Sequence, residues 1–334
     1  MDPILAIALG FIMLILGGEA LVRGAVRIAE IFNVSPLIIG IVLVGFGTSA
    51  PEMAISLQAA TLGSPGIAVG NFVGSSISNI LFILGLSALV MPIDVTSRAL
   101  SRDGMVVVLA AVAFAAVSLF LPLDTYVGFV FLLWLASYLV YAWRQERREK
   151  DQGSTSAMQK AEAHGQLRNM TIGTRVVARV KAGRPIILAL TLAIAGLILL
   201  VIGGRILVEG AVQLARQFNI DQAIIGLTIV AVGTSMPELV TSLVAAFRRQ
   251  PAVAVGNILG SNIYNILGVG GMIGIISPTA VPDQIIYFDN IVLVAASVLL
   301  LIFARSGFRL SRIEGLILFA GYGLYLYVLA ASVT

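Results

Sequence analysis

Two stretches decide how this chain is organised: VGFGTSAPEMAISL at residues 44–57 and VAVGTSMPELVTSL at residues 230–243. Each places Gly, Thr, Ser, Pro and Glu within an otherwise apolar run. A proline inside a helix removes one backbone donor and crowds the carbonyl four residues before it. We therefore expect the helices to break at Pro51 and Pro237. The carbonyls freed there need protein, water or an ion as partners, so the breaks belong in the protein interior or beside a cavity.

The two stretches belong to a longer internal duplication. At an offset of 186 positions, residues 17–85 align with residues 203–271 without a gap, and 35 of the 69 pairs are identical. Similar apolar composition cannot explain polar residues that match at a constant offset. The chain therefore consists of two related halves.

The composition places both halves in a membrane. Of the 334 residues, 59% are hydrophobic and 11% are charged, whereas soluble proteins have about 25% charged residues. Because there is no cysteine and only one histidine, disulfides, thiolate metal sites and a Ser/His/Asp triad are excluded or disfavoured. The net charge of +4 comes from basic residues between apolar runs, which fits membrane orientation better than nucleic-acid binding.

Apolar runs of about 20 residues predict membrane-spanning helices. We predict an all-α polytopic membrane protein with ten spans. They cover residues 3–22, 36–61, 67–91, 104–121, 125–143, 185–204, 223–247, 252–277, 287–304 and 313–331.

The distribution of Lys and Arg predicts the orientation. Residues 144–184 form the only long polar stretch and carry ten of the 21 basic residues, so this loop is expected in the cytoplasm. Ten spans then place nine further arginines inside and only Arg205 and Arg216 outside. Both termini should face outward from the cell (inner) membrane.

The same count gives the domain organisation. Residues 1–143 form the first five-helix repeat, 144–184 the cytoplasmic loop, and 185–334 the second five-helix repeat. Since five is odd, the second repeat enters the membrane from the opposite side. Such inverted repeats place substrate sites near the bilayer midplane, where the halves meet.

Glu52 and Glu238 are the only acids that we place deep in the membrane. A charged side chain at a helix centre costs about 2.5 to 3.5 kcal/mol on insertion scales, and no Lys or Arg lies at comparable depth to pair with either acid. Protonation could compensate this cost. Binding of a cation from solution is the alternative, and it would give the two buried acids a function.

The following spans contain matched polar stripes, in GNFVGSSISN at 70–79 and GNILGSNIYN at 256–265. Within each stripe the polar residues are spaced i, i+4, i+8 and share one helical face. Asn71 and Asn257 are as well suited to interhelical hydrogen bonds as to ion binding. The two trios are Asn71, Ser75 and Asn79, and Asn257, Ser261 and Asn265.

Carboxylates, hydroxyls, amide oxygens and freed carbonyls are hard donors, and these select hard cations. Calcium accepts about 6 to 8 oxygens in flexible geometry, whereas magnesium prefers a smaller octahedron and keeps its waters. Two carboxylates neutralise one divalent cation, and the same cage could hold sodium ions. The lack of thiolate and imidazole ligands argues against copper and zinc.

At these motifs the sequence resembles the cation/calcium exchanger superfamily, in its prokaryotic sodium/calcium exchanger-like branch. The signatures are GTSAPE at 47–52 and GTSMPE at 233–238, each with a GN-x-x-GS partner. The resemblance implies that the second, third, seventh and eighth helices enclose the ions, while helices 1 and 6 slide. Its implied ligands are Thr48, Ser49, Glu52, Ser75, Asn79, Thr234, Ser235, Glu238, Ser261 and Asn265, with carbonyls of Gly45 and Ala231.

The chain departs from some relatives in one respect. Potassium-dependent members are among those that carry Asp in one repeat where this chain has Asn79 and Asn265. The site thus holds two carboxylates instead of three, which leaves ion stoichiometry and potassium dependence open. The 144–184 loop is also too short for the calcium-sensing domains of the animal exchangers.

We hypothesise an antiporter that exchanges Ca2+ for Na+, with the bilayer as its environment and no cofactor. A proton/calcium exchanger using the same glutamates is the nearest alternative, and a passive cation channel is disfavoured by the inverted repeat. An enzyme is not expected, because the chain has no HExxH motif and no plausible triad. The pairs Gly17–Gly18 and Gly203–Gly204 fit either mobile or closely packed helices.

Overall fold

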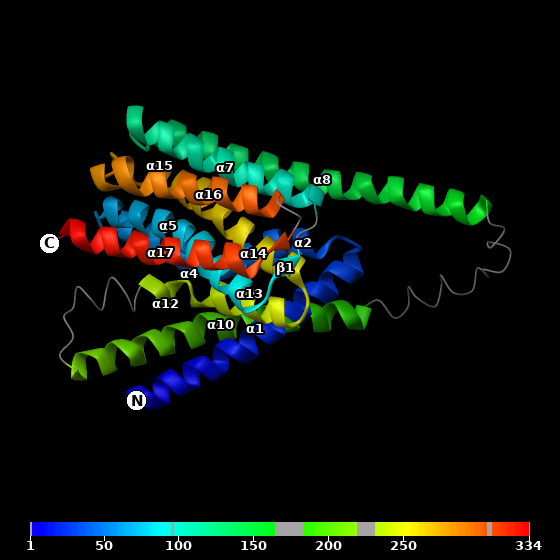
Figure 1. Ribbon diagram of the computed structural model, residues 1–334, viewed down its shortest axis with the longest axis horizontal. Helices are drawn as coiled ribbons and strands as arrows, with labels where there is room; N and C mark the ends of the chain where they lie inside the picture. The colour runs from blue at the N-terminus through cyan, green and yellow to red at the C-terminus, as the bar shows by residue number, and fades with distance from the viewer. Residues whose placement is uncertain (1, 95–96, 164–182, 219–230, 306–308, 334) are drawn as a thin grey trace.

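The computed structural model describes residues 2–94, 97–163, 183–218, 231–305 and 309–333, and nearly all of them are helical (Figure 1). The first half contains α1 (Pro3–Phe32), α2 (Pro36–Ile39), the π-helical η1 (Gly40–Gly45), α3 (Phe46–Thr48), α4 (Ala50–Thr61), α5 (Pro65–Ser78), η2 (Asn79–Leu84), α6 (Gly85–Val90), β1 (Ile93–Asp94), α7 (Ser97–Phe120) and α8 (Thr125–Ala163). The second half contains α10 (Gly183–Gln217), α12 (Ala231–Thr234), α13 (Met236–Phe247), α14 (Pro251–Ile263), η5 (Tyr264–Val269), α15 (Gly270–Ile276), η6 (Ile285–Asp289), α16 (Asn290–Arg305), β2 (Arg309–Leu310) and α17 (Arg312–Val333).

The predicted multi-pass helical fold is confirmed. Within the described ranges, eight helices are long and apolar enough to cross a membrane, and a bent pair, Pro36–Thr48 with Ala50–Thr61, makes nine. The predicted span 223–247 is represented by the short apolar helix α13, since residues 223–230 lie outside the described residues. Two short strands, β1 and β2, pair antiparallel, and an isolated bridge joins Leu123 and Thr279.

Three helices continue well beyond the C-terminal ends of their predicted spans. α1 continues beyond residue 22 to Phe32, and α10 continues beyond residue 204 to Gln217. In α1, apolar side chains stay buried at helical spacing through Ala25, Ile28 and Ala29, so packing extends the helix past its apolar centre. α8 runs to Ala163 and therefore includes the first part of the 144–184 segment, whose residues 164–182 lie outside the described residues.

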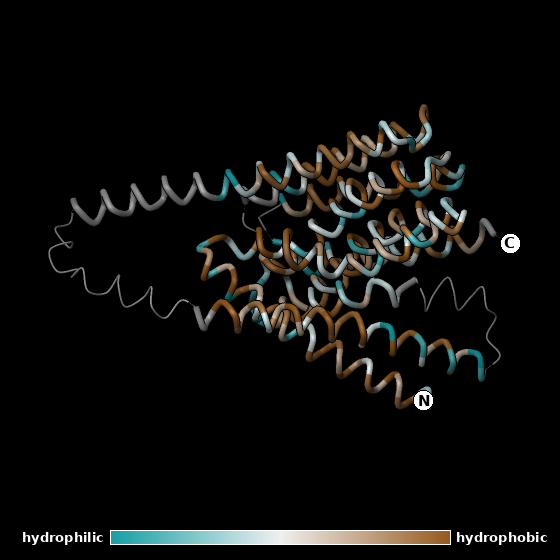
Figure 2. The backbone as a smooth tube through the Cα atoms, turned by 180° about the vertical axis from the view of Figure 1, so that it is seen from behind, coloured by the Kyte–Doolittle hydropathy of each residue, from teal (hydrophilic) through white to brown (hydrophobic). Residues whose placement is uncertain are grey.

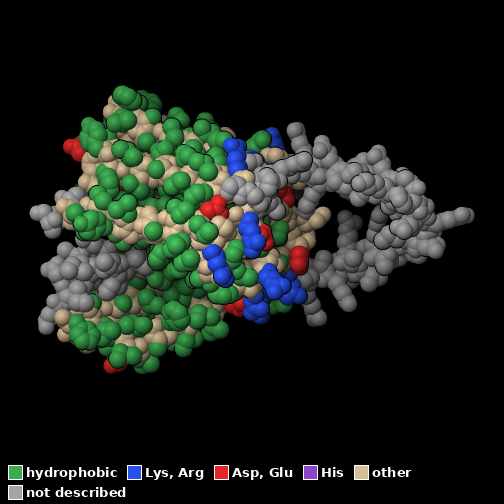
Figure 3. Space-filling model, in the orientation of Figure 1, with side chains coloured by type: hydrophobic (Ala, Val, Ile, Leu, Met, Phe, Trp, Pro, Cys, Tyr) green, Lys and Arg blue, Asp and Glu red, His purple; other side chains and the backbone are tan. Residues whose placement is uncertain are grey.

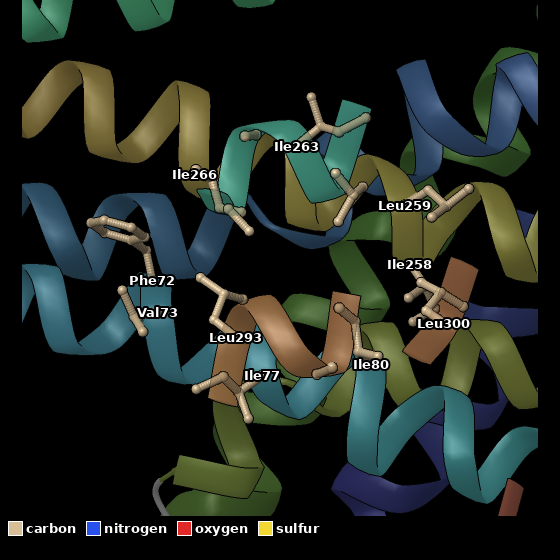
Figure 4. Close-up of a cluster of buried hydrophobic side chains, with 14 of the residues drawn as sticks. Phe72, Val73, Ile77, Ile80, Ile258, Leu259, Ile263, Ile266, Leu293 and Leu300 are labelled. Atoms are coloured by element: carbon tan, nitrogen blue, oxygen red, sulfur yellow. The ribbon is translucent and has the colours of Figure 1, made fainter. Parts of the chain in front are cut away.

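The centre of the molecule is formed by two equivalent spans, one from each half. In span 65–90, 72% of the apolar stretch is buried, and in span 251–276 the value is 89%, against 22% for the outlying helices α8 and α17. Figure 4 shows the apolar core around these spans. Its labelled side chains are Phe72, Val73, Ile77, Ile80, Ile258, Leu259, Ile263 and Ile266, with Leu293 and Leu300 of α16.

α1 and α10 form a closely packed pair along one flank of the bundle (Figures 1 and 2). Glycines recur every seven residues in both helices. A Cβ placed on Gly17 would lie 2.8 Å from the Gly196 carbonyl oxygen, and one on Gly10 would lie 2.7 Å from that of Gly203. Glycine thus lets the two backbones touch, as in other membrane helix pairs. Gly17 and Gly203 therefore lie in closely packed helices, which is one of the two roles that the sequence left open for the glycine pairs.

The chain has two distinct ends along its long axis. The N and C termini lie at one end, here called the terminus end, and α8 leaves the bundle at the opposite end, called the linker end (Figure 1). Lys and Arg side chains gather near the linker end on the face seen in Figure 3, and hydrophobic side chains cover most of the remainder. This distribution is typical of a membrane protein with one basic face.

Candidate functional site

Both predicted helix breaks are present, and each falls at the serine two residues before the proline. Ser49 separates α3 from α4, with a 44° bend between the two parts of the span. Ser235 separates α12 from α13 in the same way. The breaks place Glu52 and Glu238 in the first turn of a new helix, where the positive end of the helix dipole stabilises a carboxylate.

The two acids meet in the interior of the protein. Glu52 is 1% exposed and Glu238 is 0% exposed. Their carboxyl groups lie close enough to interact electrostatically. The Ser49 hydroxyl, from the first half, donates to Oε1 of Glu238 in the second half at 3.2 Å. The duplicated motifs therefore build one shared site instead of two separate ones.

Several polar atoms of the predicted site residues are buried without a hydrogen-bond partner among the described residues. They include Oε2 of both glutamates, Oδ1 of Asn79, both amide atoms of Asn265 and the hydroxyl of Ser235. Leaving a buried polar group unpaired costs about 1 to 3 kcal/mol. Buried oxygen atoms without protein partners on the two acids and on the residues predicted to surround them fit a bound cation.

In the part of the chain that the structure describes, no basic side chain forms an ion pair with either acid. The ion pairs among the described residues all lie elsewhere, and none includes Glu52 or Glu238. Two like charges buried together are strongly unfavourable unless they are protonated or compensated by positive charge. With oxygen donors alone, the site can compensate them with a hard cation.

Asn71 and Asn257 support the two broken helices in equivalent ways. Asn71 donates from Nδ2 to the Glu52 carbonyl at 3.3 Å and to the Ser56 hydroxyl at 2.9 Å. Asn257 donates from Nδ2 to the Glu238 carbonyl at 3.2 Å and to the hydroxyl of Ser242 at 3.0 Å. Both amide nitrogens therefore make interhelical hydrogen bonds, one of the two roles that the sequence left open.

The remaining predicted residues of the first break pack directly on the second half. The Thr48 hydroxyl donates to Oδ1 of Asn257 at 2.9 Å, and the Ser261 hydroxyl donates to the Gly45 carbonyl at 3.3 Å. Gly45 thus already accepts a hydrogen bond from the opposite half.

The predicted residues of the second break are placed differently. Thr234 and Ser75 line a cavity of about 200 Å3 between α5 and α17. The same threonine also lines a cavity of about 500 Å3 between α4 and α10. Ala231 begins α12 directly after residues that lie outside the described ranges, so its predicted role stays a prediction.

The structure adds two features that sequence reasoning missed. Asn79 opens the π-helical segment η2, and Asn265 lies at the start of η5, whereas the sequence stripes assumed regular α-helix. Such segments change the register of the side chains that follow and are frequent at functional sites. Thr241, one turn after Glu238, is fully buried with an unpartnered hydroxyl. In the sequence, its position three residues after Glu238 could have indicated that it lies on the same helical face as the acid.

Comparison with known proteins agrees with the duplicated fold. The sequence model of the family "Sodium/calcium exchanger protein" matches residues 3–144 and 188–331. The chain is 35% identical to "Putative antiporter CaxA" of Alkalimonas amylolytica, over 98% of each chain. It is 34% identical to "Sodium/calcium exchanger MaX1" of Methanosarcina acetivorans, over 97% of each chain.

The architecture is also similar to a solved exchanger structure. The sodium-calcium exchanger NCX_Mj, soaked without Na+ and Ca2+, superimposes with a TM-score of 0.80 and 30% sequence identity over 99% of each chain. The family match runs through both halves, and the structural likeness covers nearly the full length. The chain belongs to the sodium/calcium exchanger family, a family of membrane cation transporters.

Proposed function

We propose that this protein exchanges Ca2+ for Na+ across the membrane by alternating access, with Glu52 and Glu238 shared by both ions. The observation that carries the proposal is the meeting of two buried acids, one from each half, at the hydrogen bond from Ser49 to Glu238. Among the described residues, neither acid has a basic partner. The sodium/calcium exchangers among the relatives support the choice of ions.

Every ligand that we propose is an oxygen atom. Hard oxygen donors in flexible geometry suit Ca2+, and a subset of them suits Na+. Main-chain carbonyls of Gly45 and Ala231 would add to the side-chain oxygens. The side chains are Thr48, Ser49, Glu52, Ser75, Asn79, Thr234, Ser235, Glu238, Ser261 and Asn265.

Coupling follows from charge. When the site is occluded without a cation, two carboxylates are buried uncompensated, and this state is costly. Reorientation is therefore fast only when cations neutralise them. The two ions must take turns at one site, which suppresses uncoupled leak.

We propose that α1 and α10 slide as one unit past the remaining bundle. The inverted repeat supports this view, because each half can adopt the conformation of the other and so expose the site to either side. The backbone contact between the two helices makes separate movement costly.

For orientation we propose that the linker end is cytoplasmic and that both termini face outward from the cell membrane. The collection of basic side chains near the linker end supports this assignment.

Calcium flux into proteoliposomes tests the proposal. With an outward Na+ gradient and a protonophore present, we expect saturable Ca2+ uptake that stops when Na+ is replaced by choline. Uptake driven only by a proton gradient would establish the proton/calcium alternative. Uptake that needs no counter-ion and does not saturate would establish a channel.

A further inference from the structure

In the closely packed pair of α1 and α10, α1 packs against α13, the helix that bears Glu238. A Cβ placed on Gly18 would lie 3.2 Å from side-chain carbons of both Val240 and Val244 of α13. Since α10 packs backbone to backbone on α1, this contact fixes the position of both helices. Movement of the pair must open the surface between α1 and α13.

One charged contact crosses that surface. The carboxylate of Glu19, on α1, accepts a hydrogen bond from Nε of Arg248 at 2.8 Å and also pairs with its Nη2. Arg248 directly follows α13, whose first turn carries Glu238. Glu19 also pairs with Arg23, one turn further along α1. The side chain of Glu19 is only 24% exposed, so this carboxylate is partly shielded from water.

The equivalent place in the other half has no such contact. At the 186-residue offset, Glu19 and Arg23 correspond to Arg205 and Glu209, so the charges are exchanged. These two pair within α10 at 2.9 Å, and their side chains are 81% and 58% exposed. The position equivalent to Arg248 is Leu62, which cannot form an ion pair.

The space between the helices differs accordingly. Where α13 touches α1, side chains fill the surface. Where α4 faces α10, the cavity of about 500 Å3 is present instead, lined by Ala54, Gln58 and Val208 among others. Ala54 is the residue equivalent to Val240. The ion pair therefore lies on the closed side only.

We infer that Glu19 and Arg248 form a one-sided latch, a positioning contact that holds the α1–α10 pair against the helix of Glu238. The latch favours the state in which the cavity between α4 and α10 is open, and it must break when the opposite side opens. This inference rests on the proposed alternating access. No equivalent ion pair can favour the reverse state, so the sequence builds in a preference for one side.

Thiol labelling measures the latch directly, because the natural chain has no cysteine. A single cysteine at Val240, which is 8% exposed, becomes accessible only when α1 leaves α13. In inside-out vesicles treated with a membrane-impermeant maleimide, we expect Glu19→Gln and Arg248→Gln each to raise the labelling rate about threefold, the size expected for losing a partly exposed ion pair. Arg248→Lys keeps the charge and should stay near the wild-type rate.

Arg23→Gln is the matched control, because it removes an arginine from the same carboxylate without breaking the contact between helices. Its labelling rate should equal that of the parent. An unchanged rate in both Glu19→Gln and Arg248→Gln, or an equal rise in Arg23→Gln, would overturn the latch. Labelling requires no ion flux, so this result stands apart from any failure of the proposed exchange.

A second readout separates a latch from general loosening. If the latch sets the preferred side, Arg248→Gln should lower the half-saturating Ca2+ concentration on the linker side and raise it on the terminus side. Loosening alone would move both values in the same direction, and that result would contradict the inference.

Discussion

The two halves carry almost the same glycines, yet these glycines have opposite surroundings. In α14, a Cβ on Gly256 would lie 2.5 Å from the Leu37 carbonyl oxygen, and one on Gly260 would lie 2.7 Å from the Ile41 carbonyl oxygen. The equivalent Gly70 and Gly74 in α5 have no described atom within 4 Å of that position, and both line the cavity of about 200 Å3.

Among the described residues, the surface that is closed is the one over α14, and the positions equivalent to Leu37 and Ile41 lie outside the described ranges. The first half's segment from α2 to α3 is seated on α14, with hydrogen bonds from Thr48 and to Gly45. We expect the reverse state to close the surface over α5 instead. If the two halves bind the ion with the same chemistry but differ in conformation, equivalent substitutions should have equal effects at the acids and different effects at the closing surfaces.

The largest effect is expected at the acids, where the halves should be equivalent. Glu52→Gln and Glu238→Gln should each reduce Na+-driven Ca2+ uptake by more than about 100-fold, because losing one member of a buried charged cluster costs about 3 to 5 kcal/mol. Uptake into proteoliposomes measures this, and size-exclusion chromatography in detergent confirms folding. Asp283→Asn, at an exposed acid, is the control. Near wild-type uptake in either glutamine variant would remove the site assignment.

Next come the glycines, where the halves should differ. Gly260→Ala should destabilise the protein by about 1 to 3 kcal/mol, because the added methyl group is forced against backbone. Gly74→Ala should leave thermal unfolding unchanged but slow turnover, since its surface closes only in the reverse state. Thermal unfolding in detergent and uptake rates measure the two effects. Equal losses of stability would show that the two surfaces are packed alike.

A smaller difference is expected between the supporting asparagines. Asn257 is fully buried and Asn71 is half-buried. Among the contacts of the described residues, Asn257 takes part in three hydrogen bonds and Asn71 in two. Asn257→Ala should therefore cost about 1 kcal/mol more than Asn71→Ala, the typical worth of one hydrogen bond. Thermal unfolding of the two variants side by side checks the order, and the reverse order would refute it.

The smallest effect belongs to the exposed pair Arg205 and Glu209. Neutralising both should change stability by less than about 1 kcal/mol, as for other surface ion pairs. A larger loss in thermal unfolding would mean that this pair bridges to another element, as its counterpart Glu19 does.

Much of this molecule could be predicted from the sequence because its strongest signals are local. Proline inside an apolar run predicted both breaks, and the buried acids without basic partners predicted one shared polar centre. The helix ends were less accurate, because the apolar run ends near residue 22 while buried contacts prolong α1 to Phe32.

Other features could not be predicted, because they depend on packing between distant segments. No residue pattern around Asn79 or Asn265 predicts the start of a π-helical segment. The pairing of Thr48 with Asn257 joins residues 209 positions apart. Two halves so alike in sequence also cannot reveal which of them is closed, since that is a property of the conformation.

Equilibrium binding of 45Ca2+ to the purified protein tests the central claim most directly, because it needs neither orientation nor transport. We predict saturable Ca2+ binding that Na+ displaces, and loss of this binding in both Glu52→Gln and Glu238→Gln. Ca2+ binding that persists unchanged when both glutamates are replaced together would contradict a site shared by the two halves.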